Sequence, residues 1–393
     1  MDLATAARAA GYIPHLVQPS PTITGRMPVL TLLPEMAVFE THQVRGLMRF
    51  GRRLVSVRPK VYAALGLAAM RALARKVGAR GAWAQDVPLP HSILLPWTAA
   101  DRSYVRRASA GISDIAIADY IFCATGLADL ADPAVPTAIV MHDLHHARDG
   151  MGADSITPIT RDQEIALLDQ ADAVICIQSS EAGFVTAALP HRVTILAPMA
   201  ADPSPLPAAG ARDRFLFVGS NTPPNVVGLQ WFFAEVWPLV LARFPDARLD
   251  IAGTVRRAFP DGGPHGTVFH GLVEDLGALY DSAGIVISPL TFGSGLKIKL
   301  IEALARGKAV VATSITLQGV EAECADAVLA ADDPRDFANA ILALNGDDTV
   351  RADLAAAALA VARNHFSAAA CYGSFTRWLD ASAQPARARA GDT

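Results

Sequence analysis

The chain has few cysteines, and none is placed for a disulfide framework or a metal site. Its 393 residues contain four, Cys123, Cys176, Cys324 and Cys371, which stand far apart and form no Cys-x-x-Cys pair. Paired spacing is the usual sign of structural disulfides and of zinc ligands. We therefore expect buried free thiols in a reducing compartment, without disulfides or zinc.

An excess of positive charge is also missing. The chain carries 34 Lys and Arg residues against 38 Asp and Glu residues, a formal net charge of −4. A protein that holds a nucleic acid backbone needs a basic surface that displaces counterions. The charge balance therefore argues against nucleic acid as a partner.

Long apolar runs are absent as well. The opening MDLATAARAAG lacks the basic stretch and apolar run of a signal peptide, so we expect a cytoplasmic protein. The best candidate for a membrane span, residues 61–77, is interrupted by Arg71, Arg75 and Lys76 and resembles an amphipathic helix. A peripheral contact with the cytoplasmic face of the inner membrane stays open.

Two common glycine-rich nucleotide motifs are missing too. The sequence contains neither GxGxxG with a downstream acid nor GxxxxGK[ST]. These motifs shape the phosphate sites of dinucleotide-binding and P-loop proteins. Both of those site types are therefore disfavoured.

What is present is an alternation of short β-branched runs and longer helical segments, typical of βαβ units. We predict strands at residues 114–118, 137–141, 173–177 and 193–196, and in a second series at 215–218, 249–252, 268–270, 284–288 and 309–313. A Pro- and Ala-rich connector near residues 200–212 separates the series.

The predicted fold is therefore α/β, with two Rossmann-like, doubly wound parallel-sheet domains facing a central cleft. Two domains are expected because single hydrophobic cores stop growing near roughly 250–300 residues. The expected parts are a domain at 1–200, in which the usual first strand is not recognisable, a domain at 212–366, a helix at 367–384 that packs back on the first domain, and a disordered tail at 385–393.

The stretch over residues 285–313 combines the features of an anion site. It reads as a strand, a glycine-containing loop, a helix and a second strand. Gly293 and Gly295 remove side chains where the loop enters the helix, so backbone N–H groups and the helix dipole can face a diphosphate. Lys297 is a nearby countercharge, and Glu302 can accept two hydroxyl hydrogen bonds from a ribose. Each feature alone also has an ordinary structural explanation, as a turn or a solvated charge.

Four blocks stand in a recognisable order. They are FVGSNTPPNVVGLQWFF at residues 217–233, PDARLDIAG at 245–253, FHGLVEDL at 269–276 and the stretch from 293 to 313. Together they resemble the nucleotide-sugar half of the retaining GT-B glycosyltransferases of group 1 (family 4-like), particularly bacterial members of exopolysaccharide synthesis. The similarity covers residues 114–366.

The resemblance implies a nucleotide-sugar site with a role for each block. Its residues would be Gly219, Ser220 and Asn225 near the phosphates or acceptor, Leu272 and Val273 at the base, Gly293, Ser294, Gly295 and Leu296 around the diphosphate, Lys297 as countercharge and Glu302 at the ribose. Ser220 and Asn225 stand where many members carry Arg and Lys, and Ser294 stands where they carry the first Glu of a Glu-x7-Glu motif. These departures leave the identity of the sugar open.

In the N-terminal half, Asp119, His142 and Asp143 come directly after predicted strands, at the expected cleft edge. The resemblance matches His142 to a His-Asp element near the donor phosphate and acceptor, where an imidazole could bond the donor sugar or relay a proton. The alternative is a histidine that caps a turn. No carboxylate or cysteine completes a metal site with the neighbouring histidines, and the resemblance implies metal-independent catalysis. Weaker acceptor-side candidates are Tyr120, Arg148 and Glu164.

The reaction implied by the resemblance is transfer of a hexosyl group from a nucleoside diphosphate sugar to a sugar or lipid-linked sugar hydroxyl, with retention and without a cofactor. Backbone amides and Lys297 would stabilise the charge that develops on the leaving diphosphate. Two alternatives remain, a sugar-nucleotide epimerase and a degenerate sugar-nucleotide-binding scaffold subunit, because fold alone does not fix function.

Overall fold

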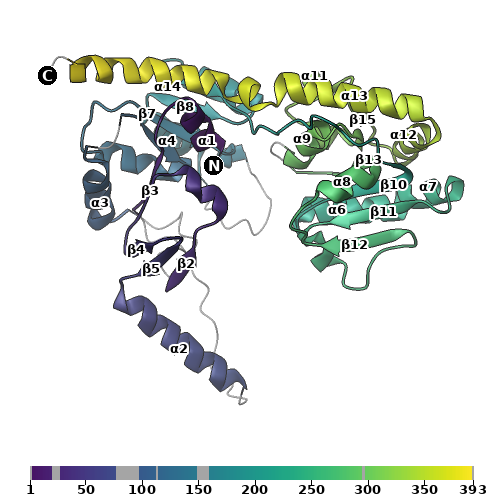
Figure 1. Cartoon of the computed structure of the whole chain (residues 1–393), viewed down its shortest axis with the longest axis horizontal. Coiled ribbons are helices and arrows are strands. Elements are labelled where there is room, and N and C mark those ends of the chain that lie inside the picture. Colours follow the sequence, from purple (N-terminus) through teal and green to yellow (C-terminus); the bar gives the residue numbers. More distant parts are fainter. Residues whose placement is uncertain are drawn as a thin grey trace. The chain divides into compact units, whose positions relative to one another are not determined.

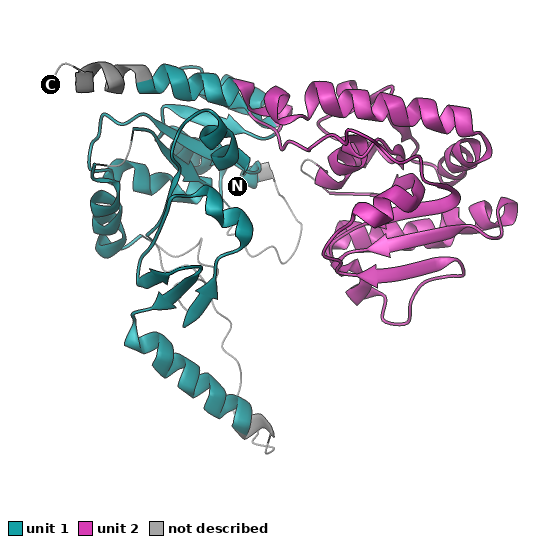
Figure 2. Ribbon diagram, in the orientation of Figure 1, with its two compact units in different colours: residues 1–177, 181–196, 374–393 teal, residues 178–180, 197–373 magenta. Residues whose placement is uncertain are grey.

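The computed structural model describes residues 2–19, 27–76, 97–111, 114–147, 159–293 and 297–391. The chain divides into two compact units (Figure 2). Unit 1 comprises residues 1–177, 181–196 and 374–393, and unit 2 comprises residues 178–180 and 197–373. The Pro-rich segment expected as a connector belongs to unit 2. Backbone hydrogen bonds hold it there, from the Ala201 N–H to the carbonyl of Phe366 and from the Ser204 N–H to the carbonyl of Ala305.

Unit 1 is built on a four-stranded parallel sheet with the order β6-β7-β8-β9. Its strands, Ala116–Asp119, Thr137–Met141, Ala173–Cys176 and Val193–Leu196, agree with the predicted ones to within two residues. The central strands β7 and β8 are almost wholly buried, as is usual for parallel strands covered on both faces. The helices around this sheet are α3 Ala99–Ser109, η5 Ile121–Asp129, η6 His145–Ala147, α4 Arg161–Leu168 and α5 Ser179–Ala188.

The N-terminal part of unit 1 holds elements that the sequence showed poorly. After α1 (Asp2–Ala9), β1 (His15–Gln18) pairs in parallel with β3 (Thr41–Val44). A small antiparallel sheet has the order β2-β5-β4, with strands Val29–Thr31, Arg53–Ser56 and Leu47–Phe50. The short helix η2 (Pro34–Val38) follows β2, and the long helix α2 (Pro59–Lys76) follows β5 (Figure 1).

Unit 2 is a six-stranded parallel sheet with the order β12-β11-β10-β13-β14-β15 (Figure 1). Its strands are β10 Ala211–Val218, β11 Arg248–Ala252, β12 Thr267–Gly271, β13 Ala283–Ser288, β14 Ala309–Ala312 and β15 Leu329–Ala330. All but β15 were predicted. β15 has only two residues, too few to show a period in the sequence.

Helices cover both faces of this sheet, each over its own apolar cluster. They are α6 Pro223–Trp231, η7 Phe232–Val236, α7 Trp237–Arg243, η8 Thr254–Ala258, α8 Gly277–Ser282, α9 Ile298–Ala305, α10 Ser314–Leu317, α11 Glu321–Cys324, α12 Pro334–Gly346 and α13 Asp348–His365. Between α6 and α7 the helical stretch is interrupted by the π-helical turn η7, which ends two residues before Pro238. Proline removes a backbone donor, and π-turns are a common cause of such irregularity.

One helical stretch of the described residues, Pro223–Arg243, is long and apolar enough by length and composition to cross a membrane. It contributes Leu229, Phe232 and Val240 to the core of unit 2, with no exposed surface on any of the three. Core helices of soluble proteins pass the same test, so the stretch is weak evidence for a span.

The C-terminal helix α14 runs from Ala368 to Gly391. Its residues from Ser374 onward group with unit 1, where the Tyr12 hydroxyl donates to Asp380 at 3.0 Å. The tail expected to be disordered from Pro385 is helical as far as Gly391. Ala and Arg, which dominate this segment, are strong helix formers, and the low apolar content that suggested disorder does not oppose a helix.

The four cysteines are free thiols, and all but Cys123 are buried. Burial raises the pKa of Cys176 and of Cys324 to about 12. Such thiols stay protonated at neutral pH and pack as small apolar side chains.

Candidate active site

The strand order of unit 2 reverses between β10 and β13. From β10 the chain proceeds to β11 and β12 on one side, and from β13 to β14 and β15 on the other. In open α/β sheets, ligands bind beyond the carboxyl ends of the strands at this point. The segments that leave it, residues 219–222 after β10 and 289–293 after β13, contain Gly219, Ser220 and Gly293 of the predicted nucleotide-sugar site.

Gly219 begins the first of these loops in a crowded position. A Cβ at Gly219 would lie 2.6 Å from the ring of Phe217. Gly253, which has a φ of +104°, faces it so closely that a Cβ there would stand 2.2 Å from the Gly219 carbonyl oxygen. The Gly253 N–H in turn donates to the carbonyl of Gly271 at 2.7 Å. The ends of β10 and β11 therefore approach so closely that Gly219 and Gly253 leave no room for side chains, and the end of β12 joins them through this backbone hydrogen bond.

Ser220 and Asn225, predicted from separate positions in the sequence, are in direct contact. The Asn225 side-chain amide donates to the Ser220 hydroxyl at 3.1 Å and to the Thr222 hydroxyl at 2.9 Å. Both residues are neutral, so this edge of the site offers hydrogen bonds without the positive charge that Arg and Lys would bring.

Gly293 lies in the second loop and approaches the start of α6. It has a φ of +123°, and a Cβ at this position would stand 3.2 Å from Cγ of Pro224. Further along α6, a Cβ on Gly228 would stand 2.4 Å from the carbonyl oxygen of Pro289. Glycines therefore allow α6 to pack directly on the loop that leads to α9.

The predicted phosphate cradle is only partly visible. Ser294, Gly295 and Leu296 lie outside the described residues. Lys297 is half-buried at the residue directly before α9, so the predicted countercharge does stand at the start of that helix.

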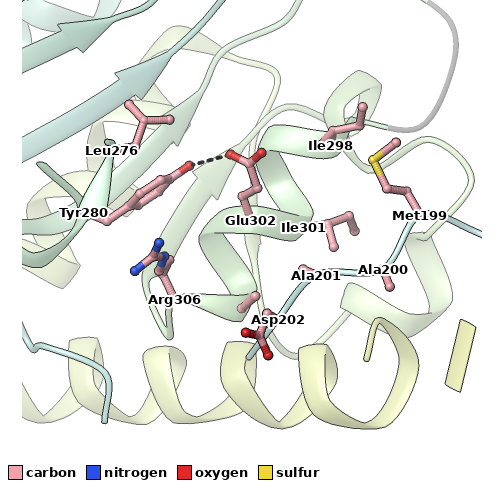
Figure 3. Close-up of a pocket in the computed structure, with 11 residues that line it drawn as sticks. Met199, Ala200, Ala201, Asp202, Leu276, Tyr280, Ile298, Ile301, Glu302 and Arg306 are labelled. Atoms are coloured by element: carbon pink, nitrogen blue, oxygen red, sulfur yellow. Dashed lines mark hydrogen bonds between the residues drawn. The ribbon is translucent and has the colours of Figure 1, made fainter. Parts of the chain in front are cut away.

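Glu302 lines a pocket of about 330 Å³ in unit 2, shown in Figure 3. The phenol of Tyr280 donates to Glu302 Oε2 at 3.5 Å, and burial raises the pKa of Tyr280, so the phenol remains a donor. The ammonium of Lys299 lies 2.8 Å and 2.9 Å from the two carboxylate oxygens. The remaining lining residues are Met199, Ala200, Ala201, Asp202, Leu276, Ile298, Ile301, Ala305 and Arg306.

A carboxylate has about four acceptor positions. The acceptor positions of Glu302 that Lys299 and Tyr280 do not occupy are available to a ligand in the pocket. The pocket thus combines the oriented Glu302 carboxylate with a mostly apolar lining that also includes Asp202 and Arg306, the pattern of small-molecule sites.

Leu272 and Val273 follow β12 and differ in exposure. Leu272 is 81% exposed, whereas Val273 packs against the core cluster below α9. Neither lines the pocket of Glu302. Their predicted contact with the base stays a prediction.

In unit 1 the structure brings together two predicted residues, His142 and Asp119. His142 follows β7, Asp119 ends β6, and the imidazole Nε2 lies 2.6 Å from Asp119 Oδ1. The hydrogen bond with His142 is the largest cause that lowers the pKa of Asp119 below its ordinary value. Asp143 adjoins this pair and is half-buried.

Tyr120 adds a strained backbone to this edge of the sheet. Its φ is +101°, a region that bulky side chains rarely adopt, and its ring stacks on His142 with centroids 4.8 Å apart. Such strain costs about 1–3 kcal/mol and is often found at functional sites. The stacked ring and the carboxylate of Asp119 together fix the plane and the direction of the His142 imidazole.

Glu164 organises the turn that follows His142. It is fully buried, and its carboxylate accepts the backbone N–H groups of His145 and His146, each at 3.0 Å. The ring of His146 lies 2.6 Å from the same carboxylate. Glu164 therefore holds the turn in place from within the protein and is not exposed to an acceptor. Among the described residues, no group of three or more His, Cys, Asp and Glu side chains could hold a metal ion.

Sequence reasoning missed Tyr280 and Arg306, which line the pocket, and Lys299, which pairs with Glu302. Lys299 could have been found, because residues three apart on a helix are neighbours and Lys299 precedes Glu302 by three. Tyr280 and Arg306 could not, because the guanidinium of Arg306 meets the Tyr280 ring, 5.9 Å from its centroid, only after α8 and α9 pack.

Comparison with known proteins gives a family match within unit 2 and solved structures that are similar over most of the chain. Residues 212–347 match the family described as "Glycosyl transferases group 1". An "Uncharacterized 44.6 kDa protein in cps region" of Klebsiella pneumoniae is 32% identical over 138 residues, which cover 32% of this chain and 36% of that protein.

Two solved structures show the same architecture at low identity. A sucrose-phosphate synthase of Thermosynechococcus elongatus has a TM-score of 0.59 and 17% identity, with 97% of this chain and 92% of that chain covered. A variant of S. aureus TarM in complex with fondaparinux, alpha-GlcNAc-glycerol and UDP has a TM-score of 0.53 and 14% identity, covering 72% of this chain and 59% of that one.

The predicted fold class is confirmed as mixed α/β with parallel sheets, and these neighbours identify it as GT-B. The family match coincides with the sheet and loops that form the switch point of unit 2. Residues 212–347 of the chain are therefore similar to the group 1 glycosyltransferases.

Proposed function

We propose that the protein transfers a hexosyl group from a nucleoside diphosphate sugar to a hydroxyl acceptor, with retention, in polysaccharide or glycoconjugate biosynthesis. The observation that carries this proposal is the pocket of unit 2, in which the Glu302 carboxylate is held by Lys299 and Tyr280. A carboxylate on an apolar lining is suited to the two hydroxyls of a ribose.

Two comparisons support the substrate classes. The TarM structure contains UDP and a GlcNAc-glycerol, as its description states. The Klebsiella relative is described as lying in a cps region. By analogy, we propose a nucleotide sugar as donor and a sugar or lipid-linked sugar as acceptor, with the reaction in the cytoplasm.

The proposed chemistry is a simple exchange of bonds. The bond between the sugar C1 and the diphosphate oxygen breaks, and a bond forms between C1 and the acceptor oxygen, whose proton leaves with the products. Negative charge grows on the diphosphate as its bond breaks, and Lys297 with the amides before α9 would stabilise it more in the transition state than before. We invoke neither a metal ion nor a further cofactor.

Donor binding is the first test. The full chain is screened for thermal stabilisation by a panel of nucleotide sugars that includes UDP-glucose and UDP-N-acetylglucosamine, since a ligand that binds the folded state raises the melting temperature. Loss of hydrogen bonds to a charged group costs about 1.5–3 kcal/mol, so Glu302→Gln should weaken the best donor by at least about tenfold. Glu235→Gln, at an exposed position of η7, is the matched control.

Product analysis separates the candidate activities. A transferase releases nucleoside diphosphate only when an acceptor is present, an epimerase converts the sugar without one, and a scaffold subunit does neither. If Lys297→Ala and Glu302→Gln both bound every nucleotide sugar as the wild type does and formed the same product, the proposed site would be wrong. Retention is read from the anomeric configuration of the product.

A further inference from the structure

Lys299 meets the Glu302 carboxylate at the edge of the pocket. Its ammonium lies 2.8 Å and 2.9 Å from the two carboxylate oxygens. Glu302 lines the pocket, whereas Lys299 is not among the lining residues. The side chain of Lys299 is 47% exposed and that of Glu302 is 34% exposed. The ammonium is therefore open to solvent on one side and bound to the carboxylate of the pocket on the other.

The stability of α9 does not account for Lys299. It is the second residue of the helix, whose first turn holds no Asp or Glu. The helix dipole is positive at this end, so a cation here is disfavoured. Ion pairs along a helix are better with Glu before Lys, whereas here Lys299 precedes Glu302 by three residues. Exposed ion pairs also contribute little to stability.

The charge balance of the predicted donor site calls for a second cation near the start of α9. Ser220 and Asn225 are neutral and bonded to each other, which leaves Lys297 as the predicted countercharge. A sugar nucleotide carries a negative charge on each phosphate, and the Glu302 carboxylate adds another close by. Like charges repel most strongly where water is partly excluded. Arg306, the cation of the pocket lining, stands at the other end of α9.

Lys299 is placed to serve both the carboxylate and a phosphate. In a nucleoside diphosphate, one CH2–O link joins the ribose to the first phosphate, so a carboxylate on the ribose hydroxyls lies beside the diphosphate. An ammonium has a further N–H donor beyond those that face the two Glu302 oxygens. The long, flexible stem of lysine lets this group turn toward a phosphate oxygen without leaving the carboxylate.

We propose that Lys299 binds the diphosphate of the donor as a second cation beside Lys297. In the free protein its ammonium neutralises Glu302, and with donor bound it also donates to a phosphate oxygen. The carboxylate can then stand next to the phosphates without repelling them. The same contact stabilises the charge that grows on the leaving diphosphate. This inference rests on the proposed function, because it requires Glu302 to bind the ribose of a nucleotide.

The experiment measures the affinity of the full chain for nucleoside diphosphates. Wild type is titrated with UDP, GDP, ADP, CDP and dTDP by calorimetry, and the tightest of them is used for all variants. Lys299→Met should weaken it by about tenfold or more, because a hydrogen bond between charged groups is lost. Lys299→Arg should keep most of the affinity, since a guanidinium also binds phosphate. Lys60→Met is the matched control, at the exposed second residue of α2.

A second background separates a direct contact from an effect that passes through Glu302. In Glu302→Gln the carboxylate charge is gone, so a lysine that only positions or neutralises Glu302 has nothing left to do. A lysine on the diphosphate still binds it. Adding Lys299→Met to Glu302→Gln should therefore weaken the diphosphate by a further factor of about ten. Equal affinities of the single and the double variant would overturn the proposal.

The turnover number gives an independent readout. With the best sugar nucleotide at saturation, Lys299→Met should lower kcat by about tenfold, because the leaving diphosphate loses a countercharge. An unchanged kcat would contradict the role in the reaction. Circular dichroism confirms that each variant is folded.

Failure of the inference and failure of the proposed function give different results. If wild type bound one of the five diphosphates and Lys299→Met bound it as tightly, Lys299 would be a solvated charge and only the inference would be wrong. If wild type bound none of them, the donor site itself would be wrong, and the inference would fall with it.

Discussion

The imidazole Nε2 of His142 lies 2.6 Å from Asp119 Oδ1, although 23 residues separate the two in the sequence. Parallel pairing of β6 and β7 produces this contact, because it places the ends of both strands at one edge of the sheet. Tyr120, with its strained backbone, stacks on the ring of the same imidazole.

Asp119→Asn should lower kcat by about tenfold, because it removes the charge that orients the imidazole while leaving a side chain of the same size. The KM for the donor should change little. Initial rates with the best donor and acceptor measure the effect. The exposed Asp114→Asn is the control, and equal rates for both variants would show that the pair has no part in the reaction.

The same pair sets a pH dependence. Because its hydrogen bond with His142 lowers the pKa of Asp119, the carboxylate stays charged in the folded protein below its ordinary pKa of 3.8. The charged carboxylate of Asp119 thus stabilises the fold above its ordinary pKa. This stabilisation is lost only as pH falls through the lower pKa that Asp119 has in the folded protein. The difference between the unfolding midpoints of wild type and Asp119→Asn should therefore be larger at pH about 5 than in stronger acid, where it shrinks as the carboxylate is protonated. A difference that stayed the same from pH about 5 down to about 2 would contradict this assignment.

Glu164→Gln should lower the free energy of unfolding of unit 1 by about 2–3 kcal/mol. The buried carboxylate accepts three N–H groups from His145 and His146, and an amide offers only one acceptor oxygen in its place. Urea denaturation measures the change. Asp162→Asn, at an exposed position of the same helix, should leave the midpoint unchanged.

Gly253→Ala should destabilise unit 2 by about 3 kcal/mol or more. The residue has a φ of +104°, and the new Cβ would stand 2.2 Å from the carbonyl oxygen of Gly219, so the loop after β10 must shift. Donor binding should weaken with it. Gly346→Ala, where a Cβ meets nothing within 4 Å, is the matched control for urea denaturation.

Lys308 should make stability rise in mild alkali. It is buried, donates to the carbonyls of Ala208 and Ala283, and has its pKa lowered by burial from 10.5 to about 8. Between these values the unfolded chain holds more protons than the folded one, so the free energy of unfolding increases with pH, by up to about 3 kcal/mol.

Comparison with Lys308→Met isolates this effect. The advantage of the wild type over the variant should grow between pH about 8 and about 10. Denaturation midpoints at a series of pH values measure it, and parallel curves for the two proteins would show that Lys308 titrates normally.

The sequence by itself determined the parallel sheets and the glycine positions. Runs such as those of β7, β8 and β13 are apolar throughout because both faces of each strand are covered, and such runs can be recognised without any partner. The need for glycine at Gly293 could also be recognised from the sequence, since a loop that enters a helix beside an anion site requires close backbone approach. The family resemblance rested on these local patterns.

Only the tertiary structure decided which side chains meet. The pocket joins Glu302 of α9 to Tyr280 of α8 and to residues 199–202, and no local pattern links segments so far apart. The pairs of His142 with Asp119 and of Glu164 with the turn after β7 likewise follow from strand order and helix packing. The short strands of residues 29–56 escaped prediction because they have too few residues for a period, and their stability comes from pairing with one another.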